Sequence, residues 1–195
     1  MKKYVSVDIE ASGRIPGKYS MLSIGACIVS NTELQFYREL KPLNSNYLLE
    51  AMKISALGLI CTNSKQECNP NNKNFRPDLV LEVLEEKGED PTRAMYDFKE
   101  WILNSTKNDD PIIAAAPIKF DGMFISWYFH NFINEDPFGH SGEDMNSMYR
   151  GLTRNIYASM KDLKVRNERG LSHNALEDAI QQAKEFEIVL SLLEK

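Results

Sequence analysis

Long apolar runs are missing from this sequence, and a membrane-spanning helix needs about 20 consecutive, predominantly apolar residues. The opening MKKYVSVDIE carries two lysines, but no apolar stretch with a small-residue cleavage site follows it. We therefore expect a cytoplasmic protein that has neither a signal peptide nor contact with a membrane.

Cysteine is scarce as well, since the chain contains only Cys27, Cys61 and Cys68. Their odd number and their spacing match neither a disulfide framework nor a zinc site. Cys27 lies in the apolar run MLSIGACIV and is predicted to belong to the core. Cys61 and Cys68 flank a polar segment and are predicted to be free thiols.

Basic residues are outnumbered, with 23 lysines and arginines against 28 acids and a net charge of -5. This balance excludes a broadly basic protein that coats nucleic acid, although gripping a single strand end requires few phosphate contacts. One segment differs, because two acids accompany six basic residues there: Arg150, Arg154, Lys161, Lys164, Arg166 and Arg169. Such a run is often a solvated face, but its position just before an acidic motif favours contact with phosphates.

The length of 195 residues and the hydrophobic content of 43% suit one globular domain, predicted to span residues 1–195. Alternating apolar and polar residues predict a strand over 3–9. Further strands over 21–29 and 34–40 follow at short spacing, which favours an antiparallel meander. A fourth strand is predicted directly after Pro111.

Helical periodicity and start signals predict helices over 46–57, from Asp90 to about Leu103, from about Asp121 to Phe132, and over 174–194. The Asn-rich segment 61–78 lacks periodicity and is predicted to be a mobile polar loop. This order of elements predicts an α/β fold in which helices flank a mixed sheet.

Two acids share one face of the first predicted strand. Because side chains alternate along a strand, Asp8 and Glu10 project from the same side. The tight exit ASG follows them. Carboxylates on a rigid strand suit a hard divalent cation, whereas a solvent-facing acidic edge is the common alternative.

A third acid, Asp121, stands where the predicted strand PIIAAA passes toward a helix. Functional side chains are often placed at such junctions. The alternative is an ordinary first-turn acid that interacts favourably with the helix dipole.

The segment SHNALEDA predicts a helix start that brings a histidine beside a carboxylate. Asn174 and Glu177 form an Asn-x-x-Glu capping pattern, which makes Asn174 the N-cap. His173 then precedes the cap and Asp178 lies in the first turn, positions whose side chains approach each other. The alternative is a surface histidine beside a first-turn acid.

Together the three motifs resemble those of the DEDDh group of 3′-5′ exonucleases, which are DnaQ-like members of the ribonuclease H-like superfamily. The resemblance extends from position 4 to about position 186, and Pro117 stands where the family often has asparagine. The matching residues are Asp8, Glu10, Ser12 and Gly13, then Phe120 and Asp121, then His173, Ala175, Asp178 and Ala179.

The resemblance implies a ribonuclease H-like fold with a central, mixed five-stranded sheet flanked by helices. It also implies a catalytic site with two divalent ions, Mg²⁺ or Mn²⁺, held by Asp8, Glu10, Asp121 and Asp178. His173 is the implied general base. The implied substrate is the 3′ end of single-stranded nucleic acid, which is hydrolysed to nucleoside 5′-monophosphates.

Contact with the strand is predicted for Ser12, Met21, Leu57 and Phe124, because terminal bases need an apolar surface beside a few polar groups. Apolar periodicity also suits Met21, Leu57 and Phe124 as core residues. His130 and His140 lack a partner pattern and are predicted to be structural or surface residues.

Three alternatives stay open at this point. No motif reports a contact to the 2′-hydroxyl, so the substrate is either RNA or DNA. A catalytically silent nucleic-acid-binding module on the same fold is the main functional alternative, because a fold does not establish activity. The third alternative is a scaffold protein whose acids are only surface groups. It would require that the three motifs match the family in sequence and order by coincidence. The oligomeric state is undetermined, with a homodimer among the options.

Overall fold

The computed structural model describes residues 2–107, 109–163, 165 and 172–193. Its centre is a five-stranded sheet with the strand order β3-β2-β1-β4-β5. The strands are β1 (Lys2–Ala11), β2 (Met21–Ile28), β3 (Asn31–Glu39), β4 (Asp110–Ala115) and β5 (Gly142–Asp144). β1, β2 and β3 pair antiparallel, whereas β4 pairs parallel to both β1 and β5. The predicted meander and the mixed α/β sheet are confirmed.

Six α-helices in the described chain accompany the sheet: α1 (Leu49–Ser55), α2 (Pro77–Lys87), α3 (Pro91–Thr106), α4 (Ile118–Phe132), α5 (Met145–Thr153) and α6 (Ala175–Leu193). Two short 3-10 helices lie at Gln66–Cys68 and Met160–Leu163. Four of these α-helices were predicted, and α2 and α5 were missed. Among the described residues, no helix combines the length and the apolar character that crossing a membrane requires.

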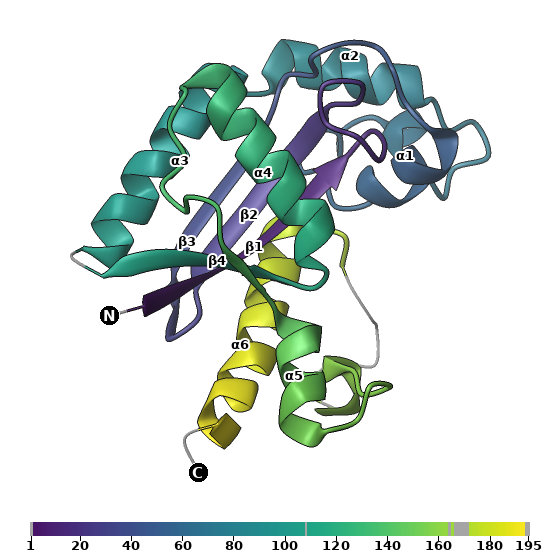
Figure 1. Ribbon diagram of the computed structural model, residues 1–195. Helices are drawn as coiled ribbons and strands as arrows, with labels where there is room; N and C mark the ends of the chain where they lie inside the picture. The colour runs from purple at the N-terminus through teal and green to yellow at the C-terminus, as the bar shows by residue number, and fades with distance from the viewer. Residues whose placement is uncertain (1, 108, 164, 166–171, 194–195) are drawn as a thin grey trace.

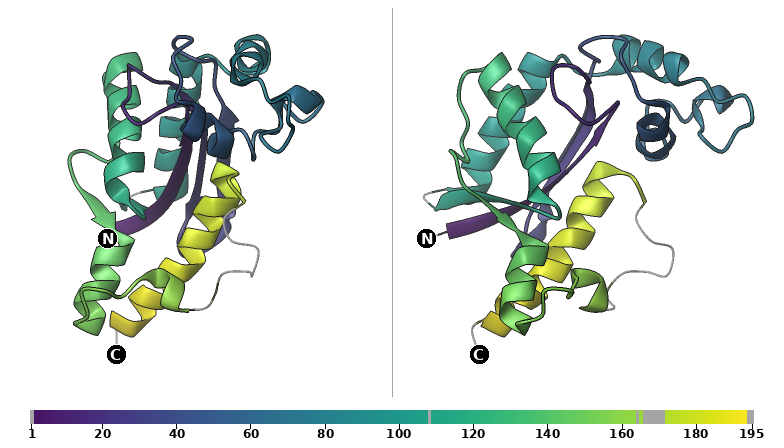
Figure 2. Two further views of the ribbon diagram at one scale, coloured as in Figure 1. Left: turned by 90° about the vertical axis from the view of Figure 1, so that its right-hand side faces the viewer. Right: turned by 45° about the vertical axis from the view of Figure 1, so that its right-hand side comes forward.

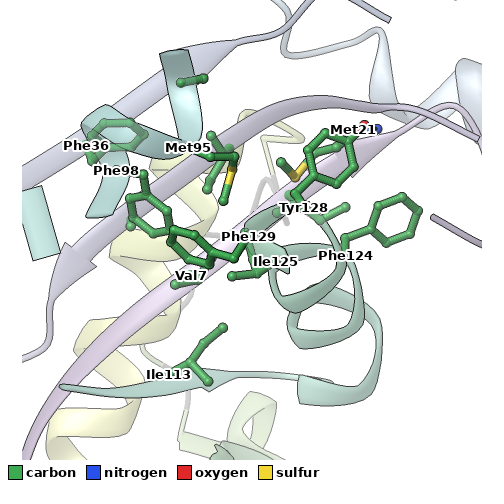
Figure 3. Close-up of a cluster of buried hydrophobic side chains, with 14 of the residues drawn as sticks. Val7, Met21, Phe36, Met95, Phe98, Ile113, Phe124, Ile125, Tyr128 and Phe129 are labelled. Carbon is green, nitrogen blue, oxygen red and sulfur yellow. Dashed lines mark hydrogen bonds between the residues drawn. The ribbon is translucent and has the colours of Figure 1, made fainter. Parts of the chain in front are cut away.

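The helices form a layer on each face of the sheet, with α3 and α4 on one side and α6 on the other (Figures 1 and 2). Val5, Val7 and Ile9 point from β1 into the first layer. There Phe98 of α3 stacks on Phe129 of α4 with ring centroids 5.6 Å apart (Figure 3). This packing fixes the orientation of β1.

The opposite face of β1 meets α6. Tyr4 packs edge-on against Phe186, with ring centroids 5.2 Å apart. The Ser6 hydroxyl donates a 2.8 Å hydrogen bond to the carbonyl of Ala179. Because side chains alternate along the strand, Asp8 and Glu10 also face α6.

A glycine allows α6 to approach the sheet next to these acids. Gly25 of β2 pairs with Asp8 of β1. A Cβ atom at Gly25 would lie 2.2 Å from the backbone of Ala175 and Leu176, closer than real Cβ contacts allow. The start of α6 therefore lies directly over the strand that carries Asp8.

The segment 61–78 is folded into turns beside α2 instead of forming an open loop. Cys68 is buried there in a small apolar cluster with Leu59, Val80 and Leu84. The predicted mobility of segment 61–78 stays a prediction. All three cysteines are free, and Cys27 belongs to the core as predicted.

Candidate active site

The start of α6 has the capping residue that the sequence predicts. Asn174 Oδ1 accepts hydrogen bonds from the backbone N–H groups of Leu176 and Glu177, at 3.1 and 3.2 Å. Glu177, the other residue of the capping pattern, is exposed, and the backbone N–H of Asn174 donates to Ser172 Oγ at 3.2 Å.

Asp178 holds the residues that precede the helix. Its Oδ1 accepts from the backbone N–H and the hydroxyl of Ser172, at 2.9 and 3.1 Å. Its Oδ2 accepts from the backbone N–H of His173 at 3.0 Å. His173 has a φ of 59°, a left-handed conformation that is uncommon for a residue with a side chain. Asp178 therefore stabilises the turn that presents the imidazole.

The first and third motifs meet in space. Ligand atoms of Glu10, His173 and Asp178 all lie within 4.8 Å of one another. Glu10 reaches this point from β1, and the other two residues come from the start of α6. The predicted proximity of His173 and Asp178 is thus present, and Glu10 completes a cluster that is able to hold a metal ion.

Asp121 joins the second motif to the first. The carboxylate is 3% exposed, and its Oδ1 accepts a 3.1 Å hydrogen bond from the backbone N–H of Ile9. Ile9 lies between Asp8 and Glu10 on β1. The predicted helix start at Asp121 was wrong, because α4 begins at Ile118, directly after Pro117. Asp121 instead occupies the first turn and faces the sheet.

Four carboxyl groups in a buried space make the local charge unfavourable. Burial raises the pKa of Glu10 to about 8 and the pKa of Asp121 to about 7. Burial also raises the pKa of Asp8 well above its ordinary value, and the negative charges of Asp121, Glu10 and Asp178 raise it further. Such a group of acids is stabilised in its ionised form by a bound cation.

The donor set fits a divalent metal. Carboxylate oxygens are typical ligands of Mg²⁺ or Mn²⁺, which also keep bound water. The buried Ser23 hydroxyl has no hydrogen-bond partner among the described residues. Ser23 of β2 stands opposite Glu10 of β1 in the strand pairing. A hydrated ion beside Glu10 would supply such a partner.

The raised pKa values predict that the metal-free protein loses stability as the pH rises. The folded carboxyl groups keep their protons to higher pH than the unfolded chain does. The stability that these carboxyl groups contribute is therefore fully present below pH ~4. It is lost as the pH rises through about 7 for Asp121 and about 8 for Glu10.

Glu10→Gln removes one of these groups. At pH 9 in chelator it is expected to raise the free energy of unfolding by ~1 kcal/mol, which corresponds to a Tm rise of ~2–4 °C. At pH 4 the effect is expected to vanish. Thermal melts of both proteins provide the measurement, with Glu177→Gln as an exposed control. Equal Tm differences at both pH values contradict the electrostatic account.

The predicted strand contacts differ in their surroundings. Met21 and Phe124 are fully buried in the core, so their side chains offer no surface to a base in this structure. Ser12 is buried as well, and its hydroxyl donates to the carbonyl of Asn46 and accepts from Ser20 N–H. These three positions serve the packing of the site. Leu57 is 38% exposed and remains available.

Leu57 adjoins the third motif through its neighbour Gly58. The carbonyl of Gly58 accepts a 2.8 Å hydrogen bond from Asn174 Nδ2. A Cβ atom at Gly58 would lie 2.0 Å from the carbonyl oxygen of His173, so only glycine fits this contact. The exposed Leu57 side chain therefore lies on a segment that packs against His173.

The predicted basic run is only partly described. Arg154 and Lys161 are exposed, and Arg150 Nε donates to the carbonyl of Ala158. Lys164, Arg166 and Arg169 lie outside the described residues. His130 and His140 are exposed, in agreement with their prediction as surface residues.

One buried polar residue of the site was missed by the sequence analysis. Gln182 of α6 donates from Nε2 to Asp8 Oδ1 at 2.7 Å. Its position one helical turn after Asp178 is the only signal in the sequence, because residues four apart share a helix face.

Comparison with known proteins identifies the family of this chain. The family model described as the 3′-5′ exoribonuclease Rv2179c-like domain matches residues 3–190. The chain is 36% identical over 197 residues to the 3′-5′ DNA exonuclease Cap18 of Escherichia coli, covering 98% of this chain and 94% of that relative.

Solved structures show the same fold. The zinc-bound complex of E. coli exonuclease I with single-stranded DNA has a TM-score of 0.64 at 13% identity. The complex of that enzyme with a dA16 oligonucleotide has a TM-score of 0.65 at 14% identity. The chain spans only 42% and 41% of those two exonuclease I chains. At this identity the likeness establishes the ribonuclease H-like fold alone. The match over residues 3–190 shows that the chain belongs to the 3′-5′ exoribonuclease Rv2179c-like family and is a 3′-5′ exonuclease.

Proposed function

We propose that the chain removes nucleotides from the 3′ end of single-stranded nucleic acid by a two-metal mechanism and releases nucleoside 5′-monophosphates. The observation that carries this proposal is the convergence of three distant segments on one site. Glu10, His173 and Asp178 present ligand atoms within 4.8 Å of one another. Asp121 and Gln182 are bonded to the backbone of Ile9 and to the side chain of Asp8, respectively, in the same strand.

The carboxylates of Asp8, Glu10, Asp121 and Asp178 would hold two Mg²⁺ or Mn²⁺ ions. Bound ions of this kind polarise the scissile phosphate and lower the pKa of an attacking water. The protein contributes a buried site, because Asp121 and Asp178 are each 3% exposed. Low exposure excludes competing water and strengthens electrostatic interactions inside the site.

His173 would act as the general base that takes the proton from the attacking water. Its backbone N–H is held by Asp178 Oδ2, which limits the movement of the turn. A base on a fixed turn keeps its ring nitrogen near the proton that it accepts, and this geometry determines its efficiency.

The strand end would stack against Leu57, on the segment that contacts the His173 turn. One apolar contact and a few phosphate contacts suit a substrate that is gripped at its end, in a chain with a net charge of -5. The intact set of chemical groups favours this enzyme over a catalytically silent binding module.

Both RNA and DNA are candidate substrates. The matching family model is described as an exoribonuclease domain, whereas the E. coli relative is named a DNA exonuclease. Discrimination depends on contacts to the 2′-hydroxyl, and RNA and DNA strands of identical sequence test it directly.

The proposal is tested with RNA and DNA oligonucleotides that carry a label at the 5′ or the 3′ end. With Mg²⁺ or Mn²⁺, 5′-labelled strands are expected to give a ladder that shortens from the 3′ end. The 3′ label is expected to appear at once as a mononucleotide. Chelator is expected to stop both reactions. Internal cleavage, or degradation that persists in chelator, would refute the proposal.

A further inference from the structure

Gln182 is a buried polar residue that none of the three motifs includes. It is 3% exposed and lies on α6 one turn after Asp178. Burying an amide is costly unless its donor and acceptor are both hydrogen-bonded. Both ends of the Gln182 amide have such partners.

The two hydrogen bonds fix the direction of the amide. Oε1 accepts from the backbone N–H of Ala116 at 2.9 Å. A backbone N–H only donates, so the oxygen of the amide must face Ala116 and the NH₂ group must face the other way. There Nε2 donates to Asp8 Oδ1 at 2.7 Å. This distance is typical of a charge-assisted hydrogen bond to a carboxylate.

This one side chain joins the three segments of the site. It extends from α6, which carries Asp178, to Asp8 on β1. Its other end binds Ala116, at the junction between β4 and the helix that carries Asp121. A hydrogen bond to one carboxylate oxygen restricts rotation of the whole carboxylate group. Residues that orient a metal ligand in this way commonly influence metal affinity by about 10–100-fold.

We propose that Gln182 is a positioning residue that holds the Asp8 carboxylate in its metal-binding orientation. This inference rests on the proposed function, because it requires Asp8 to be a metal ligand. The competing explanation is purely structural, namely that Gln182 only attaches α6 to the end of β4.

The test compares Gln182→Met with Gln181→Met. Gln182→Met keeps the length of the side chain but removes both hydrogen bonds. Gln181 is the neighbouring glutamine, and its amide bonds Glu185 at 3.2 Å. Titration calorimetry with Mn²⁺ is expected to show ~10–100-fold weaker binding to Gln182→Met and unchanged binding to Gln181→Met.

Gln182→Glu separates the two explanations and guards against misfolding of Gln182→Met. It preserves an oxygen that faces Ala116 N–H, but replaces the donor that faces Asp8. A positioning role predicts a folded protein whose kcat is ~10–100-fold lower with an unchanged KM for the oligonucleotide. Wild-type kcat and half-saturating Mn²⁺ concentration in Gln182→Glu would overturn the proposal.

The inference and the proposed function fail in different ways. If the wild-type protein binds Mn²⁺ but cleaves no strand, the exonuclease mechanism is refuted, and calorimetry still measures the role of Gln182. If the wild-type protein is active and both Gln182 variants bind Mn²⁺ normally, only the positioning role is refuted.

Discussion

Asp178→Asn is expected to lower the rate of Mn²⁺-dependent strand hydrolysis by ~10³-fold or more, since a metal ligand supplies several kcal/mol of transition-state stabilisation. Asp178 is central to the site. It shares a cluster with Glu10 and His173, and it also accepts three hydrogen bonds from Ser172 and His173. Initial rates on a 5′-labelled oligonucleotide at saturating Mn²⁺ provide the measurement.

Glu177→Gln is the matched control, because Glu177 precedes Asp178 on the same helix and is exposed. It is expected to keep the wild-type rate. Asp8→Asn is a second test from a different element. Asp8 lies on β1 and makes none of the hydrogen bonds by which Asp178 holds the turn before α6. A comparable loss in Asp8→Asn would show that metal binding is the cause. Near-wild-type rates in either Asp178→Asn or Asp8→Asn contradict the metal site.

His173→Ala is expected to lower kcat by ~10²–10⁴-fold, the usual contribution of a general base. Its position allows two roles, because the imidazole lies within 4.8 Å of the Glu10 and Asp178 ligand atoms. If His173 is the base, Mn²⁺ affinity is retained when kcat falls. Single-turnover rates and Mn²⁺ calorimetry on the same protein distinguish the base from a ligand.

His140→Ala is the control for this experiment, because His140 is exposed and belongs to no motif. Its rate and its Mn²⁺ affinity are expected to equal those of the wild type. A parallel loss of Mn²⁺ affinity in His173→Ala would assign His173 as a ligand. An unchanged kcat would exclude it from the chemistry.

The local geometry of the site was predictable where a short-range period governs it. The alternation of strand side chains places Asp8 and Glu10 on one face, and the Asn174 cap brings His173 to Asp178. The approach of Asp121 to β1 involves residues 112 positions apart. No local pattern predicts such a contact. The place of Asp121 in the site was implied by the family resemblance alone.

Gln182 escaped prediction for a different reason. On a helix with an apolar stripe, an additional glutamine is ordinarily solvated, and the burial of Gln182 comes with its long-range hydrogen bonds to Asp8 and Ala116. Similarly, Glu177 fits the capping pattern, but it is exposed, and the backbone N–H of the Asn174 cap bonds Ser172 Oγ instead.

The fold shows the same division between local and long-range information. The meander follows from alternation and short links, so it was predicted. α2 was missed, although Pro77 at its start and the spacing of Val80, Leu81 and Leu84 are helical signals. β5 has three residues and, among the described strands, pairs with β4 alone. So short a strand carries too little periodicity to be identified.

The most direct test of the metal centre is an anomalous difference map from crystals grown with Mn²⁺ and a nucleoside 5′-monophosphate. The account predicts two peaks, one among Asp8, Glu10 and Asp178 and the other beside Asp8 and Asp121. A map that shows the bound nucleotide but no manganese among these carboxylates would contradict it.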